Sequence, residues 1–380
     1  MRAHAAALAA SGARVTIVAG RGRKVAGAEL VLIPEIDSTH PLVLGDLRDL
    51  ARGRVTDGHA RLVGSLVRSL GPVLRSADRV VVHNVLTMSL SLALAEALAA
   101  LAKEGREMIA WTHDIAWLDP RCGPERHPGD PWDLIARAAP NVRYVAVSEE
   151  RARQLAALTG MPRRRVAVVP NGIDLVQRLG LSREGADLSE RMGLLEADPL
   201  LLLPARLTRR KRVEVAIDAL AALRRRHPRA ALVVTGSPGP HNINNLEYGA
   251  ELARRASKVP GAYLLHALGI RPGERLMTDL FAMADVLVLP SESEGFGIPM
   301  LEAGSHGVPV VASDLPTLRA LAGDDATFVA PTASGAVLAR AVERRLSSDP
   351  VARLRRRAKQ HAWPRLLRER VIPLILDDVP

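Results

Sequence analysis

The sequence predicts an α/β protein built from two Rossmann-like domains, each with a doubly wound parallel sheet. Strand-like apolar runs alternate with amphipathic helical stretches along the chain, which is the pattern of βαβ units. The runs consist largely of Val, Leu, Ile and Ala, as expected for strands that helices cover on both faces. Two such sets, of five or six runs each, follow one another, and this indicates two sheets.

The first set of expected strands ends at the turn Pro170-Asn171-Gly172. Its members are 14–18, 30–33, 79–82, 108–111, 143–147 and 166–169. The second set comprises 200–203, 231–234, 262–265, 286–289, 308–311 and 327–329. We expect a first domain over residues 1–180, a second over 181–360, and a helical tail over 361–380 that is a candidate to cross back to the first. The polar segment 182–197 is expected to be a helical linker.

Composition narrows the class of protein. The longest apolar run, 90–102, contains Glu96 and is too short to span a bilayer. The single cysteine, Cys122, fits a reducing compartment. We therefore expect a cytoplasmic protein.

The formal net charge is +11, but aromatic residues make up only 3 % of the chain, which argues against the stacking platforms of single-strand nucleic-acid binders. Peripheral attraction to an anionic membrane face at the inner membrane remains an alternative source of the charge.

The strongest motif is the segment Ser291–Glu302, with the sequence SESEGFGIPMLE. It follows an expected strand and enters a helix, and a helix start behind a glycine-rich turn offers free backbone N–H groups to an anion. Glu294 lies on the loop and Glu302 lies one turn into the helix. Two carboxylates at such a turn suit hydroxyl groups, as on a sugar and a ribose. The alternative is that Glu302 complements the helix dipole and Glu294 is a surface residue.

A second motif, LPARLTRRKR over residues 203–212, follows the first expected strand of the second domain. Arg206 and Lys211 are expected at the carboxyl edge of the sheet, where open α/β folds bind ligands. Cations placed there would stabilise a diphosphate that gains charge as it leaves. The alternative is a solvated basic start of a helix.

Together these motifs resemble the family-4 retaining glycosyltransferases, which have the GT-B fold. The matching pieces are WTHD (111–114), VVPNGID (168–174), ARLTRRK (205–211) and EGFGIPMLEAGSHGVPVVAS (294–313). The resemblance implies two domains that face each other across a cleft and a hexose donor linked to UDP or GDP. No cluster of metal ligands is apparent in the sequence, and Arg206 with Lys211 can supply the positive charge of a metal ion. We therefore expect that no metal is required and that no cofactor is bound permanently.

The family assigns roles at the matching positions. Arg206 and Lys211 hold the donor diphosphate, and Glu294 binds the transferred sugar. Glu302 binds the ribose hydroxyls. His113 approaches the sugar from the first domain, although a lone histidine is otherwise more often structural. The segment lining the sugar and phosphates consists of Gly295, Phe296, Gly297 and Ile298.

Three further segments are less decisive. His83 and Asn84 end an expected strand and are candidates to contact the acceptor. The polar loop 236–245 is a candidate contact to the nucleotide or the sugar, or an ordinary surface loop. The chain opens with a helix, whereas the family begins with a strand and a glycine-rich loop. We therefore expect the first domain to lack its first strand. This would leave 14–18 and 79–82 without a shared neighbour and residues 1–380 poorly active.

The donor sugar, the nucleotide, the acceptor (a glycan, a lipid or a small metabolite), the linkage and the oligomeric state do not follow from these patterns. Other interpretations are a nucleotide-sugar epimerase, a sugar phosphorylase and a catalytically impaired nucleotide-sugar-binding fragment. A phosphorylase would carry a lysine for pyridoxal phosphate, and no candidate beyond Lys211 is present. Nucleotide-sugar consumption with and without acceptors separates a transferase from an epimerase.

Overall fold

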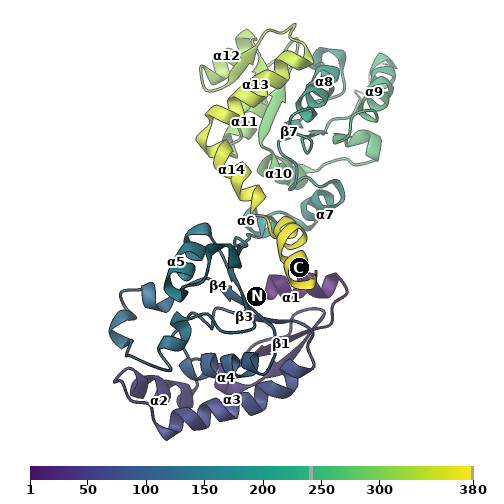
Figure 1. Cartoon of the computed structure of the whole chain (residues 1–380). Coiled ribbons are helices and arrows are strands. Elements are labelled where there is room, and N and C mark those ends of the chain that lie inside the picture. The colour runs from purple at the N-terminus through teal and green to yellow at the C-terminus, as the bar shows by residue number, and fades with distance from the viewer. Residues whose placement is uncertain (239–242, 378–380) are drawn as a thin grey trace. The chain divides into compact units, whose positions relative to one another are not determined.

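The structure, a computed structural model, describes residues 1–238 and 243–377, and the chain divides into two units. Unit 1 comprises Met1–Gly172 and Trp363–Pro380, and unit 2 comprises Ile173–Ala362. Each unit has parallel strands flanked by helices (Figure 1). The predicted fold class, with two Rossmann-like domains of the GT-B type, is confirmed. The chain leaves unit 1 after the turn at 170–172, whereas the expected domain limits were 180 and 360.

Unit 2 contains one sheet of six parallel strands in the order β12-β11-β10-β7-β8-β9. The central strands β7 and β10 are paired, with Leu287 opposite Leu202. The four residues of each are at most 1 % exposed, because helices cover both faces. The strand bounds are β7 Leu200–Leu203, β8 Ala231–Val234, β9 Ala262–Leu264, β10 Val286–Leu289, β11 Val310–Ser313 and β12 Thr327–Val329.

The helices of unit 2 enclose this sheet, and α8 and α13 pack against each other. Their bounds are α6 Leu175–Arg178, α7 Arg183–Met192, α8 Val213–Arg224, α9 Ile243–Ala256, α10 Glu274–Met283, α11 Ile298–Ser305, α12 Pro316–Ala322, α13 Gly335–Ser348 and α14 Pro350–Gln360. The expectation that 182–197 is a linker was wrong. Leu188 and Leu194 in this segment are buried in the core of unit 2, so α7 is part of the domain.

Unit 1 contains two parallel sheets, β1-β2 and β3-β4-β5-β6. The strand bounds are β1 Val15–Ala19, β2 Ala28–Leu32, β3 Val80–His83, β4 Met108–Thr112, β5 Val142–Ala146 and β6 Val166–Val168. In the described residues β1 and β3 lie in different sheets, which agrees with the expectation that these two strands lack a shared neighbour.

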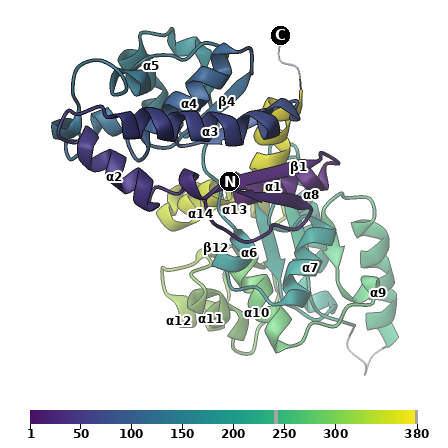
Figure 2. The ribbon, with the colours of Figure 1, turned by 90° about the horizontal axis from the view of Figure 1, so that it is seen from below.

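Helices cover both faces of the four-stranded sheet. On one face α3 runs alongside α4 (Figure 2). On the other face Leu8 from α1 and Val371 and Ile375 from the C-terminal segment pack against Ile109 and Trp111 of β4, and Figure 1 shows this segment beside α1. The helix bounds are α1 Arg2–Ala10, α2 Pro41–Leu50, α3 Asp57–Arg75, α4 Leu92–Lys103, α5 Glu149–Thr159, α15 Trp363–Leu366 and α16 Ile372–Leu376.

One polar cluster joins three helices of unit 1. His59 of α3 is 3 % exposed, and its Nδ1 lies 2.9 Å from a carboxylate oxygen of Asp46 in α2. Its Nε2 lies 3.0 Å from Glu96 in α4. Burial opposes the charge of the imidazole, but the hydrogen bonds and negative charges of Asp46 and Glu96 prevail and raise the pKa of His59 to about 9. The protonated ring therefore links α2, α3 and α4 at neutral pH.

Candidate functional site

The two motifs of unit 2 follow neighbouring strands at the centre of the sheet. The segment 204–212 comes after β7, and the segment 290–297 comes after β10. Chain order reverses between these strands, since β8 and β9 lie on one side of the pair and β11 and β12 on the other. Ligands of open α/β sheets bind outside the carboxyl ends of the strands at such a point. The strand order therefore places both motifs at this candidate site.

Lys211 and Glu294 form an ion pair that joins the two motifs across 83 residues of sequence. The Lys211 Nζ lies 2.5 Å from Oε1 of Glu294, and the two side chains are 13 % and 9 % exposed. The buried Ser291 hydroxyl donates a second hydrogen bond of 2.7 Å to the same Oε1. Two donors thus fix the carboxylate where solvent is largely excluded, so its position is set before any ligand arrives.

Backbone contacts hold the two loops together beside this pair. The Glu292 N–H donates to the Arg210 carbonyl at 2.7 Å, and the Arg210 guanidinium donates to the Ser293 carbonyl at 3.0 Å. The Thr317 hydroxyl, at the start of α12, donates to the Glu294 carbonyl at 3.1 Å. The Glu294 loop is therefore anchored from two directions.

Helix α11 begins directly after this loop. Its N-cap, Gly297, has φ +100°, and an added Cβ would lie 2.6 Å from the Leu318 side chain. Only glycine fits this position without strain. No side chain caps the helix, so its first backbone N–H groups, next to exposed Gly295, Phe296 and Ile298, are available to an anion.

Arg206 and Glu302 are both exposed. Arg206 follows β7, and Glu302 lies on α11, one turn beyond Ile298. Within the described part of the chain, neither side chain forms an ion pair. The start of the polar loop 236–245 lies next to Arg206, because an added Cβ on Gly236 would lie 2.0 Å from the Ala205 carbonyl oxygen. Residues 239–242 of that loop lie outside the described residues.

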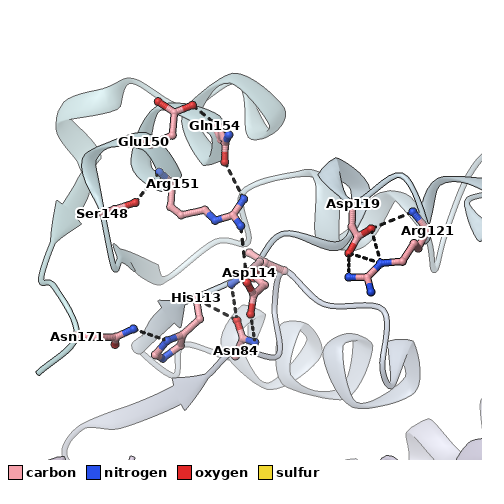
Figure 3. A network of polar contacts seen from close by, with 11 residues as sticks. Asn84, His113, Asp114, Asp119, Arg121, Ser148, Glu150, Arg151, Gln154 and Asn171 are labelled. Carbon is pink, nitrogen blue, oxygen red and sulfur yellow. Dashed lines mark hydrogen bonds and ion pairs between the residues drawn. The ribbon is translucent and has the colours of Figure 1, made fainter. Parts of the chain in front are cut away.

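In unit 1, Asn84 fixes the loop that carries His113. Asn84 follows β3 with φ +55°, and its Oδ1 accepts hydrogen bonds of 3.0 Å from the backbone N–H groups of His113 and Asp114. Figure 3 shows this network, which continues from Asp114 to Arg151 of α5 over 3.7 Å. His113 thus lies at the carboxyl end of β4, as predicted.

The His113 ring is neutral at physiological pH, because partial burial lowers its pKa. The Asn171 side-chain amide lies 3.5 Å from its Nδ1. If this amide donates, Nδ1 accepts and Nε2 carries the proton. His113 and Glu294 belong to different units, so their predicted approach stays a prediction.

The rings of His4, His83 and Trp111 form a buried cluster next to His113. The ring centroid of His83 is 6.3 Å from that of His113, and the ring of His4 is 4.6 Å from Trp111. Burial lowers the pKa of His83 to about 3 and that of His4 to about 4. The Nδ1 atoms of both rings are buried and have no partner among the described residues. His83 was a predicted candidate at the end of a strand, whereas His4 was not predicted. The only signal for His4 is its place on the apolar face of the first helix.

Two features do not occur among the residues that the structure describes. No three His, Cys, Asp or Glu side chains there are placed to hold a metal ion. No helix there is both long and apolar enough to cross a bilayer.

Two family models match consecutive parts of the chain. The model for glycosyltransferase family 4 matches residues 1–177, and the model for glycosyl transferases group 1 matches residues 187–362. Between them the two models cover both units except for residues 178–186 and 363–380.

Curated relatives carry the same family resemblance. The D-inositol 3-phosphate glycosyltransferase of Nocardia farcinica is 35 % identical over 49 % of this chain and 40 % of its own length. The corresponding protein of Nocardiopsis dassonvillei is 32 % identical over 61 % of this chain and 50 % of its own. The chain thus spans about half the length of these relatives.

Among solved structures, a UDP-forming α,α-trehalose-phosphate synthase from Burkholderia xenovorans is 17 % identical over 91 % of this chain and 86 % of that chain, with a TM-score of 0.40. The family models and the motif loops at the switch point of unit 2 agree with each other, and the chain belongs to the group 1 glycosyltransferases of family 4.

Proposed function

We propose that this chain transfers a hexose-type sugar from a UDP- or GDP-linked donor to an acceptor hydroxyl, with retention of anomeric configuration. The observation that carries the proposal is the Lys211–Glu294 pair at the switch point of the unit 2 sheet. An enclosed cation and carboxylate beside an uncapped helix start offer separate partners for a diphosphate and for sugar hydroxyls.

Lys211, Arg206 and the α11 amides bind the donor diphosphate. The Lys211 ammonium has three protons, and the ion pair with Glu294 uses one of them. The exposed Arg206 guanidinium adds a second cation. As the bond to the sugar breaks, the diphosphate gains negative charge, so these fixed donors stabilise the transition state more than the ground state. They supply the charge that a metal ion brings elsewhere, and we propose a metal-independent reaction.

Glu294 binds the transferred sugar, and Glu302 binds the ribose. Both donors to Glu294 reach Oε1, so Oε2 can accept from a sugar hydroxyl. The exposed Glu302 carboxylate suits two adjacent ribose hydroxyls. His113 contributes a hydrogen bond to the sugar from unit 1.

Retention follows from departure and attack on the same face of the sugar. The bond from the anomeric carbon to the diphosphate oxygen breaks, and the acceptor oxygen bonds to the same carbon. The acceptor proton passes to the leaving phosphate oxygen, which balances the charge. No protein carboxylate then needs to form a covalent intermediate.

The acceptor is proposed only by class, as a hydroxyl compound. The names of the curated relatives support a test of D-inositol 3-phosphate. A glycan, a lipid and an unphosphorylated polyol complete the acceptor panel.

The first experiment is a thermal-shift screen of UDP-, GDP- and ADP-sugars, since a ligand of the native state raises the melting temperature. The donor that binds is then incubated with each acceptor, with and without EDTA, and the anomeric configuration of the product is read by NMR. Consumption of the donor without any acceptor would instead indicate an epimerase. A thermal shift without turnover would indicate a binding protein.

Paired variants test the site. Glu294→Gln and Arg206→Gln should each lower kcat/KM roughly a hundredfold, about the cost of one lost hydrogen bond to the transition state. Glu302→Ala should mainly weaken nucleotide binding. Glu292→Gln and Arg209→Gln, which alter exposed neighbours, are the matched controls and should retain activity within about twofold. Equal activity of Glu294→Gln and Glu292→Gln would contradict the assignment.

A further inference from the structure

A cavity of about 810 Å³ lies in unit 2, beside Pro199, which precedes β7. It therefore lies at the amino end of the sheet, whereas the proposed donor site lies at the carboxyl end. The rest of its lining comes from α8, the segment that follows α8, α13 and α14. Five of the lining side chains are basic by type: Arg226, His227, Arg340, Arg344 and Arg356.

Acidic groups balance only part of this charge. Glu343 is the one carboxylate in the lining, and it lies 3.3 Å from both Arg226 and His227. Arg356 pairs with Asp198 at 2.5 Å. Arg340 and Arg344 lie one turn apart on α13 and are exposed. Neither has an acidic partner in the part of the chain that the structure describes, so two cations of the lining are available to an external anion.

Helix α14 lies next to the cavity and adds exposed arginine and apolar side chains to the arginines of α13. Arg353 on α14 donates to the Ser347 carbonyl at 2.7 Å, which joins α14 to α13 beside the cavity. Ala352 and Lys359 form the buried side of α14. Leu354 projects from the opposite side and is 68 % exposed, and Val351 is 57 % exposed. Figure 1 shows α13 and α14 next to each other along the edge of unit 2.

We propose that this surface, defined by Arg340, Arg344, Arg353, Leu354 and Arg357, binds an anionic membrane. Arginine side chains attract lipid phosphates, and an exposed leucine inserts among the acyl chains. The phosphates of a nucleic acid would also attract these arginines, but a nucleic acid offers no apolar partner for Leu354. The donor loops leave from the opposite edge of the same sheet, so a bilayer at α13 and α14 leaves the carboxyl edge of that sheet uncovered.

Vesicle co-sedimentation of the full chain tests the proposal, and it needs no enzymatic activity. Vesicles of phosphatidylcholine with about 30 % phosphatidylglycerol are compared with pure phosphatidylcholine at about 0.15 M salt. The double variant Arg340→Gln/Arg344→Gln should lower partitioning onto the anionic vesicles roughly thirtyfold, which corresponds to about 2 kcal/mol at 1.4 kcal/mol per factor of ten.

The control is Arg254→Gln/Arg271→Gln, which removes the same charge from exposed positions elsewhere in unit 2 and should change partitioning by less than threefold. Leu354→Ser should lower partitioning at high salt as well, because its contribution is apolar. Equal losses in the two arginine pairs would show unspecific attraction and overturn the proposal. A loss of RNA binding in Arg340→Gln/Arg344→Gln, with vesicle binding unchanged, would assign the surface to nucleic acid instead.

Discussion

Raising the pH from 7 to 9 should destabilise unit 1 through His59. The pKa of His59 is about 9 in the folded chain, against about 6.5 for an unfolded histidine. Below pH 6.5 both states carry the proton, and the full stabilisation by Asp46 and Glu96 is present. As the pH rises through 9 the folded state loses its proton and the stabilisation disappears. The difference in pKa predicts a loss of about 2 kcal/mol between pH 7 and pH 9.

Intrinsic fluorescence can follow this loss in unit 1 alone. The chain has four tryptophans, at 111, 117, 132 and 363, and all four belong to unit 1. Urea titrations monitored by tryptophan emission at several pH values therefore give the unfolding free energy of that unit.

Variants separate His59 from other groups that titrate in this range. In His59→Gln the decline between pH 7 and pH 9 should be smaller by about 2 kcal/mol than in the wild type. Glu96→Gln removes one of the two negative charges, so the decline should shift to lower pH. If the His59→Gln and wild-type curves run parallel between pH 7 and pH 9, the proton on His59 does not stabilise unit 1.

Three further predictions concern unit 2. Gly297→Ala should lower the free energy of unfolding, measured by calorimetry, by about 1–3 kcal/mol, because φ is +100° and Leu318 lies 2.6 Å from the added Cβ. The control Gly295→Ala, which has open space around its added Cβ, should change this free energy little. Equal effects of the two variants would refute the strain argument. Lys359→Met should cost about 3–5 kcal/mol by thermal unfolding, because it leaves the buried Asp285 without its cation at 2.7 Å, and the exposed Lys258→Met is the control. Ser291→Ala should lower kcat/KM roughly tenfold, because Glu294 loses a 2.7 Å hydrogen bond, while the exposed Ser293→Ala should retain near-wild-type turnover.

Periodicity predicted most of the strands, because strands buried on both faces must be apolar throughout. The prediction that 182–197 is a linker failed because this segment is mostly polar and buries only a few residues, such as Leu188 and Leu194. A short amphipathic helix at the edge of a domain and a helical linker have similar composition. Contact with the core, which composition does not reveal, distinguishes them.

Motifs predicted which loops of unit 2 lie at the candidate site but not how their side chains pair. Lys211 and Glu294 had been assigned to different parts of the donor, whereas they bind each other at 2.5 Å. This pairing depends on the adjacency of β7 and β10, which sequence order alone does not give. The hydrogen bonds by which Asn84 anchors the His113 loop were likewise not predicted. They depend on the left-handed backbone of Asn84, φ +55°, which is a property of the folded loop.

The return of the chain to unit 1 determines when each unit can finish folding during synthesis. Unit 2 is one continuous stretch, Ile173–Ala362, whereas unit 1 needs both Met1–Gly172 and Trp363–Pro380. Val371 and Ile375 cover part of the apolar face that Ile109 and Trp111 form, and this part stays uncovered while about 190 intervening residues are made. At about 5–20 residues per second this wait lasts roughly 10–40 s. The domain whose first segment is made earliest is therefore the last to be completed, and in the interval part of its apolar sheet face lacks a cover.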